Sequence, residues 1–136
     1  MDFEDLMIGQ TASLGKTITE ADILLFAAVS LDTNPVHVNE EAAKASIFGT
    51  RIAHGMLSAS LLSAVLGTQL PGPGTIYMGQ TLRFRAPVKP GETVIATVEI
   101  TALNEEKKRA TLKTVCAVGD EVVIEGEAYV QVPSRG

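Results

Sequence analysis

Residues 55–69, with the sequence GMLSASLLSAVLGTQ, contain no charged side chain. Apolar side chains fall on almost every side of a helix drawn through them, and the polar interruptions, Ser58, Ser60 and Ser63, are small. A helix that is apolar all round is usually buried. The sequence Pro71-Gly72-Pro73-Gly74 then ends the helical pattern. We therefore predict one long buried helix that begins near Gly55.

The chain that follows this helix has the pattern of β-strands. Four strand candidates are separated by short turns: Ile76–Ala86, Thr93–Leu103, Arg109–Val118 and Glu121–Val132. In the second candidate the even-numbered residues from Val94 to Ala102 are all apolar, and their alternation predicts one buried face. Consecutive strands joined by short turns form an antiparallel sheet. We expect this sheet to pack against the long helix.

The chain before the long helix has weaker patterns. It predicts one short strand and two short helices: Thr11–Ile18, Ala21–Ser30 and Glu40–Ala45. Thr19, followed three residues later by Asp22, resembles a capping box, and Asn34-Pro35 predicts a turn. The economical packing is a curled antiparallel sheet wrapped around the one long helix, an α+β arrangement. This is the hot-dog architecture, and we expect residues 1–136 to form a single domain of this kind.

Composition excludes several classes of function. The formal net charge of −5 argues against a nucleic-acid binder, which would present a basic face. One cysteine rules out an internal disulfide, and with only two histidines a metal site is not expected. No stretch reaches the roughly 18 apolar residues of a membrane span, and the acidic N-terminus lacks the pattern of a signal peptide. We expect a cytoplasmic protein that uses neither membrane nor metal.

Asp32 and His37 are the first candidate for chemistry. They lie five residues apart across the Asn34-Pro35 turn, which can bring a carboxylate and an imidazole to one point. Such a pair can share one water molecule, one group accepting its proton while the other holds it. The spacing alone favours a plainer interpretation, in which Asp32 forms an Asx turn and His37 is a surface residue.

Gly55 is the second candidate, because a helix N-terminus offers free N–H groups that can hold a developing oxyanion. Taken by itself, the position favours a glycine required only for close packing at the helix entry, and His54 would then be a packed or capping residue. Arg83 and Arg85, on one face of a strand, could contact phosphates, although an outer solvated face is commoner. Cys116, in an alternating strand, is predicted to be a small core residue.

These motifs together resemble the MaoC-like (R)-specific enoyl-CoA hydratases. Asp32-Thr33-Asn34-Pro35-Val36-His37 resembles the Asp-x-Asn-Pro-x-His motif of that family, and Ala53-His54-Gly55-Met56 is similar to its downstream His-Gly-Met sequence. Gly79–Phe84 and Pro87–Glu92 resemble the strand and turn that follow, and the likeness covers about residues 9–132. Two motifs at the right separation favour a catalytic role for Asp32 and His37.

The resemblance implies a reaction and roles for single residues. A trans-2-enoyl-CoA would be hydrated to the (R)-3-hydroxyacyl-CoA without metal or cofactor. Asp32 would activate the water, His37 would bind it and assist proton transfer, and the Gly55 N–H would bind the thioester oxygen. Further substrate-binding residues are implied: Asn34, which holds the loop, Ser63, Leu66 and Tyr129 around the acyl chain, and Arg83 and Arg85 near the CoA. A bulky Tyr129 favours short acyl chains.

The resemblance also implies a homodimer whose sheets join across the interface, since a single hot-dog domain leaves a sheet edge exposed. Two other functions stay open at this point. An acyl-CoA thioesterase can share this fold, but the usual carboxylate on the central helix is absent, because residues 56–70 contain no Asp or Glu. A non-catalytic acyl-thioester-binding module would not need Asp32 and His37 together.

Overall fold

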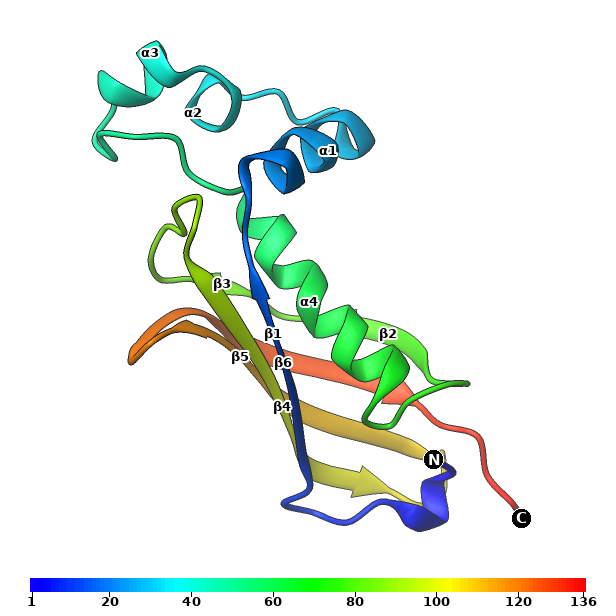
Figure 1. The fold of residues 1–136 in the computed structure, drawn as a ribbon. Coiled ribbons are helices and arrows are strands. Elements are labelled where there is room, and N and C mark those ends of the chain that lie inside the picture. The colour runs from blue at the N-terminus through cyan, green and yellow to red at the C-terminus, as the bar shows by residue number, and fades with distance from the viewer.

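The computed structural model describes residues 1–136 as one antiparallel sheet wrapped around a central helix, α4 (Figure 1). Helix α4 spans Gly55–Thr68, as the apolar pattern predicted. The six strands are β1 (Thr11–Thr17), β2 (Ile76–Gln80), β3 (Arg83–Phe84), β4 (Thr93–Asn104), β5 (Arg109–Val118) and β6 (Glu121–Gln131). Their order in the sheet is β1-β4-β5-β6-β2, and β3 pairs with β6. The predicted α+β hot-dog arrangement is confirmed.

Three short helices gather over the N-terminal end of α4, and the termini of the chain lie at the far end of the sheet (Figure 1). These helices are α1 (Glu20–Ser30), α2 (Pro35–Val38) and α3 (Glu40–Lys44); a single 3-10 turn covers Phe3–Asp5. The predicted capping box is present, because the Thr19 hydroxyl accepts from the Asp22 N–H and the Asp22 carboxylate accepts from the Thr19 N–H. The segment between α1 and α4 is therefore held above the helix end where the candidate residues lie.

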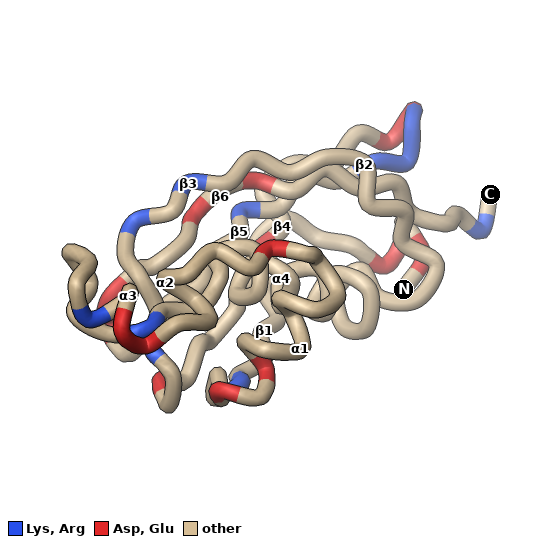
Figure 2. The backbone as a smooth tube through the Cα atoms, turned by 90° about the horizontal axis from the view of Figure 1, so that it is seen from above, with Lys and Arg blue, Asp and Glu red and all other residues tan.

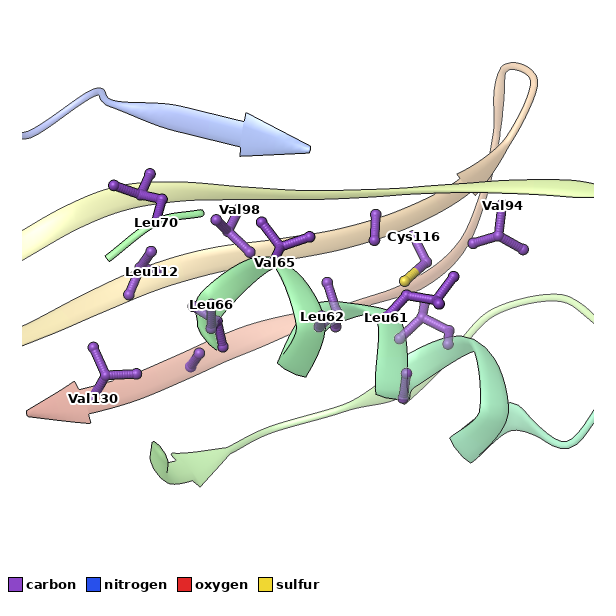
Figure 3. Packing of buried hydrophobic residues seen from close by; sticks show 14 of the residues in the cluster. Leu61, Leu62, Val65, Leu66, Leu70, Val94, Val98, Leu112, Cys116 and Val130 are labelled. Carbon is purple, nitrogen blue, oxygen red and sulfur yellow. The ribbon is translucent and has the colours of Figure 1, made fainter. Parts of the chain in front are cut away.

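The core lies between α4 and the concave face of the sheet. Leu61, Leu62, Val65 and Leu66 of α4 project towards side chains of β4, β5 and β6, among them Val98, Leu112, Cys116 and Val130 (Figure 3). Leu62 and Val65 are wholly removed from solvent. Full burial of such a side chain contributes about 1.5–3 kcal/mol, so this contact is the main reason why the sheet closes around α4.

The predicted alternation of β4 fails at its end. Val94, Ala96, Val98 and Ile100 are buried as expected, but Ala102 is exposed. The register with β5 shifts between Ile100 and Ala102, and a β-bulge of this kind turns the following side chains to the opposite face. Leu103 packs against the core in place of Ala102. The assignment of Ala102 to the buried face was wrong.

The predicted strand Ile76–Ala86 is divided into β2 and β3. The chain leaves strand geometry at Thr81 and Leu82, where the Thr81 N–H still donates to the Glu127 carbonyl and the Thr81 hydroxyl accepts from the Glu127 N–H. The Thr81 carbonyl oxygen comes so near to Gly126 that a Cβ there would lie 1.9 Å from it. Only glycine on β6 allows this approach, and it fixes the place where the strand breaks.

Charged residues are spread over the loops, the short helices and the strands, whereas α4 carries none (Figure 2). Ion pairs tie several of these segments together. Arg51, just before α4, pairs with Glu20 of α1 and with Glu40 of α3. None of the helices combines the length and the apolar character that a membrane span requires.

Candidate active site

A cavity of about 490 Å³ opens at the N-terminal end of α4. We call it the α4 pocket. Its lining includes all three residues predicted to be catalytic, Asp32, His37 and Gly55, and also His54, Ser58, Phe84 and Arg85. The α4 pocket therefore brings together residues from four segments: the loop after α1, helix α2, the start of α4 and strand β3. The remainder of the wall is mostly apolar and includes Phe48, Met56 and Ile124.

The side chains of Asp32 and His37 come together in this pocket. A carboxylate oxygen of Asp32 and a ring nitrogen of His37 lie within 4.8 Å of each other, close enough to bind one water molecule between them. Asp32 is exposed at the mouth and His37 is buried. Asp32 also accepts a hydrogen bond from the Asn34 N–H at 3.2 Å, so the Asx turn of the plainer interpretation is present too. That bond engages one carboxylate oxygen and leaves the other for a ligand.

The hydrogen bonds of His37 fix which of its ring nitrogens can act as a base. Nδ1 lies 2.8 Å from the Ile52 carbonyl oxygen. A carbonyl can only accept, so Nδ1 carries the hydrogen and donates it. In the neutral ring Nε2 is then the unprotonated nitrogen, and no protein group bonds it. His37 thus offers the pocket a hydrogen-bond acceptor of the kind needed to hold a water molecule.

His54 lies behind both residues and was not among the predicted site residues. Its side chain is 98% buried, being only 2% exposed, and its Nε2 donates to the Asp32 carbonyl oxygen at 2.8 Å. Its ring stacks on that of His37, with centroids 3.9 Å apart, and meets Phe26 on another side. The His-Gly-Met likeness drew attention to His54, but only the folded chain brings it against Asp32 and His37.

Gly55 presents the free end of α4 to the pocket. No side chain caps this helix, and neither the Gly55 N–H nor the Met56 N–H donates to another protein group. Free N–H groups at a helix N-terminus attract an anionic oxygen. A Cβ at Gly55 would lie 2.5 Å from the ring of Phe84, so both predicted reasons for glycine, close packing and an open N–H, hold together.

Asn34 shapes the loop that carries Asp32. Its Oδ1 accepts from the Val36 N–H at 3.2 Å and so caps α2, in which Pro35 takes the first position. Asn34 does not line the α4 pocket. Its position agrees with the expectation that it holds the loop.

Arg83 and Arg85 have different positions. Arg83 lies opposite Glu125 of β6 in the register of β3, and Arg85 lies just beyond the end of that strand at Phe84. Arg85 lines the α4 pocket and pairs with Glu125 of β6, and this contact lowers the pKa of the Glu125 carboxyl below its ordinary value. Arg83 is exposed outside the pocket.

The three residues predicted to surround the acyl chain are not in the α4 pocket. Ser63 is exposed on α4, and Leu66 is buried in the core. Tyr129 projects from the face of β6 that points away from α4, because Ala128 and Val130 on either side of it are buried. Tyr129 lines a different cavity of about 480 Å³, together with Met78 and Arg109.

Asp32, His37 and His54 are also the three residues that could hold a metal ion, with donor atoms within 4.8 Å of one another. The geometry does not favour one. His37 and His54 each use one ring nitrogen on a backbone carbonyl, and their rings are stacked with 26° between the planes. The site fits a water molecule better than a metal.

Comparisons with known proteins agree with this geometry. The model of the family described as MaoC like domain matches residues 7–123. The (R)-specific enoyl-CoA hydratase of Rhodospirillum rubrum is 63% identical over 134 residues, which are 98% of this chain and 93% of that protein. The 3-hydroxybutyryl-CoA dehydratase of Methylorubrum extorquens is 53% identical, over 98% of this chain and 85% of its own length.

A solved structure, the (R)-hydratase from A. caviae involved in PHA biosynthesis, superposes with a TM-score of 0.93 at 46% identity. The match covers 96% of this chain and 99% of that one. The fold and the length thus agree over nearly the whole chain. The chain belongs to the family of MaoC-like domains.

Proposed function

We propose that this protein adds water across the double bond of a trans-2-enoyl-CoA to give the (R)-3-hydroxyacyl-CoA, and catalyses the reverse dehydration. The observation that carries the proposal is the meeting of Asp32, His37 and the free N–H of Gly55 in one pocket. Relatives 63% and 53% identical are named a hydratase and a dehydratase, which are the two directions of this reaction.

Each proposed step uses a group that the pocket presents. A water molecule lies between the Asp32 carboxylate and His37 Nε2. Asp32 accepts one of its protons while the oxygen attacks C3 of the enoyl group. The π electrons move towards the thioester oxygen, where the Gly55 N–H stabilises the enolate. The proton that Asp32 accepted is then delivered to C2, which restores the carboxylate and completes the addition of water. Groups so placed contribute about 10²–10⁴-fold as acid or base and about 10²–10³-fold as an oxyanion donor.

A single assay separates this proposal from its alternatives. Crotonyl-CoA is mixed with the protein, and both the absorbance of the conjugated thioester and the appearance of free thiol are followed. Loss of absorbance without thiol is the expected result. Release of thiol would instead identify a thioesterase, which the absence of a carboxylate on α4 already disfavours. Binding with neither change would identify a non-catalytic module. Chiral chromatography of the product tests for the (R) configuration.

We propose that the protein acts as a homodimer. Strand β2 lies at one edge of the sheet and exposes Ile76 and Met78, which are 59% and 47% accessible. An exposed apolar edge strand favours pairing with another strand. Sedimentation equilibrium should give twice the mass of the chain, and Ile76→Lys should shift the equilibrium towards the monomer. Arg83 and Arg85, near this side of the sheet, are proposed to meet the CoA phosphates.

The remaining expectations from the sequence are also proposals. We propose that residues 1–136 act as one domain, which is supported by a single core cluster that extends from Phe3 to Val132. Contacts of Ser63, Leu66 and Tyr129 with the acyl chain, and the short chain length inferred from Tyr129, stay predictions. A cytoplasmic location is a prediction that cell fractionation tests. The absence of a cofactor is a prediction that the activity of the dialysed protein tests.

A further inference from the structure

Ser58 carries a buried hydroxyl that no protein group satisfies. The residue is 1% exposed, and its Oγ has no hydrogen-bond partner. Two other hydroxyls of α4 behave differently: Ser60 donates to the Leu57 carbonyl and Thr68 donates to the Ala64 carbonyl. A serine in a helix ordinarily makes this bond to the preceding turn. An unpaired buried hydroxyl costs free energy, so its position calls for a partner.

Ser58 lines the α4 pocket near the free end of the helix, with its hydroxyl oxygen just beneath the pocket surface. Ser58 follows Gly55 by three residues, which places both on one side of α4. Side chains of a helix tilt towards its N-terminus, so that of Ser58 covers the turn where the Gly55 N–H is free. The neighbouring thiol of Cys116 contacts the Ser58 carbonyl oxygen and leaves the hydroxyl unused.

We propose that the Ser58 hydroxyl donates a second hydrogen bond to the substrate's thioester oxygen, beside the N–H of Gly55. The inference rests on the proposed function, in that the ligand is an acyl thioester. It adds a residue to the site: the oxygen that becomes negatively charged is held by one backbone donor and one side-chain donor. The bond also satisfies the buried hydroxyl when substrate is bound.

The test compares Ser58→Ala with Ser60→Ala, the same substitution on the same helix at a hydroxyl bonded to a backbone carbonyl outside the pocket. With crotonyl-CoA we expect kcat/KM to fall about 10- to 100-fold in Ser58→Ala, since a donor to the developing oxyanion is lost. Ser60→Ala should stay within about twofold of the parent protein. Thermal unfolding of Ser58→Ala should be unchanged or higher, because an unpaired polar group is removed.

A spectroscopic measurement reports on the bond itself. Crotonyl-CoA labelled with ¹³C at the thioester carbonyl is bound to an Asp32→Asn protein, and its carbonyl stretch is recorded by isotope-edited infrared difference. Two donors should lower the frequency relative to free ligand, and Ser58→Ala in the same background should return part of that shift. Ser58→Cys, which keeps the size but weakens the donor, should lie between them and serves if the alanine variant folds poorly.

Equal frequency and equal kcat/KM in Ser58→Ala would overturn the inference, and would leave the hydroxyl to a bound water. Its failure is distinguishable from failure of the proposed function. If the parent protein does not hydrate crotonyl-CoA, the hydratase proposal is lost, but the carbonyl shift of the bound thioester still reports whether Ser58 donates to it.

Discussion

The ring of His54 stacks on the ring of His37, with 3.9 Å between the centroids and 26° between the planes. The same residue donates from Nε2 to the carbonyl oxygen of Asp32 at 2.8 Å. One buried side chain thus contacts both proposed proton-transfer residues, the imidazole face of one and the backbone of the other. Because Asp32 is in an exposed loop, this bond is its main link to the interior of the protein. We infer that His54 is a positioning residue.

Replacing His54 by phenylalanine tests this positioning. His54→Phe keeps an aromatic ring against His37 and Phe26 but removes the donor to Asp32. We expect kcat to fall about 10- to 100-fold with little change in KM, since misplaced catalytic groups lose rate more than binding. The free energy of unfolding should fall by about 1 kcal/mol. Phe26→Leu, which removes a ring contact but no hydrogen bond, is the control for stability, and an unaltered kcat in His54→Phe would contradict the role.

Asp32→Asn keeps the size of the side chain and its acceptor for the Asn34 N–H, but not its basicity. We expect kcat for crotonyl-CoA to fall about 10²–10⁴-fold, the usual contribution of a general base. The melting temperature should change little, because the side chain is exposed. Asp120→Asn, in the exposed turn between β5 and β6, is the matched control and should retain full activity. A rate unchanged in Asp32→Asn removes this residue from the mechanism.

Gly55→Ala and Gly67→Ala place the same methyl group at two sites on α4. At Gly55 it would lie 2.5–2.6 Å from two atoms of the Phe84 ring, whereas at Gly67 it meets nothing within 4 Å. Since Phe84 lines the pocket and is half-exposed, its ring should swing aside and alter the site. We expect Gly55→Ala to lower kcat/KM about 100-fold.

Gly67→Ala should leave activity unchanged and raise the free energy of unfolding by about 0.5–1 kcal/mol, because alanine favours a helix. Gly55→Ala combined with Phe84→Ala should recover activity to the level of Phe84→Ala alone. Steady-state kinetics of the four variants measures this. If the double variant is no better than Gly55→Ala, the clash with Phe84 is not the cause of the loss.

The sequence predicted those elements whose environment is the same along their whole length. The apolar run over residues 55–68 predicted the central helix, and seven of its fourteen residues are buried against the sheet, although Met56, Ser60 and Ser63 are exposed on its other side. The even-numbered residues from Val94 to Ile100 are all buried, and the alternation of apolar residues in the sequence predicted this face correctly. The Asp32 and His37 pairing came from the spacing of two motifs together with family resemblance. In each case a local pattern agreed with the tertiary environment.

The predictions from sequence failed where the structure depends on contacts between segments that are far apart in the chain. The bulge after Ile100 depends on pairing with β5, and the break at Thr81 depends on the missing side chain of Gly126. No local pattern contains either fact. The alternation of the buried Ala128 and Val130 places Tyr129 on the outer face of β6. Ser58 and His54 could be identified only from the structure, because the fold leaves the Ser58 hydroxyl without a partner and stacks the His54 ring on that of His37.

Cys116 gives a prediction with a definite dependence on pH. The thiol is fully buried beneath α4, and this burial raises its pKa from 9.0 to about 11. The folded protein therefore keeps the thiol neutral across the pH range in which the unfolded chain forms thiolate, which is the reactive species. The neutral buried thiol therefore contributes to the free energy of unfolding. This contribution is fully present below pH 9 and is lost as the pH rises towards 11.

The reactivity of Cys116 tests this burial. At pH 8 Ellman's reagent should not react with native protein within minutes, but should titrate one thiol per chain in guanidinium. Cys116→Ala should react in neither condition. Prompt reaction of the native protein at pH 8 would mean that the contact between β5 and α4 opens readily, and would place Cys116 outside the closed core.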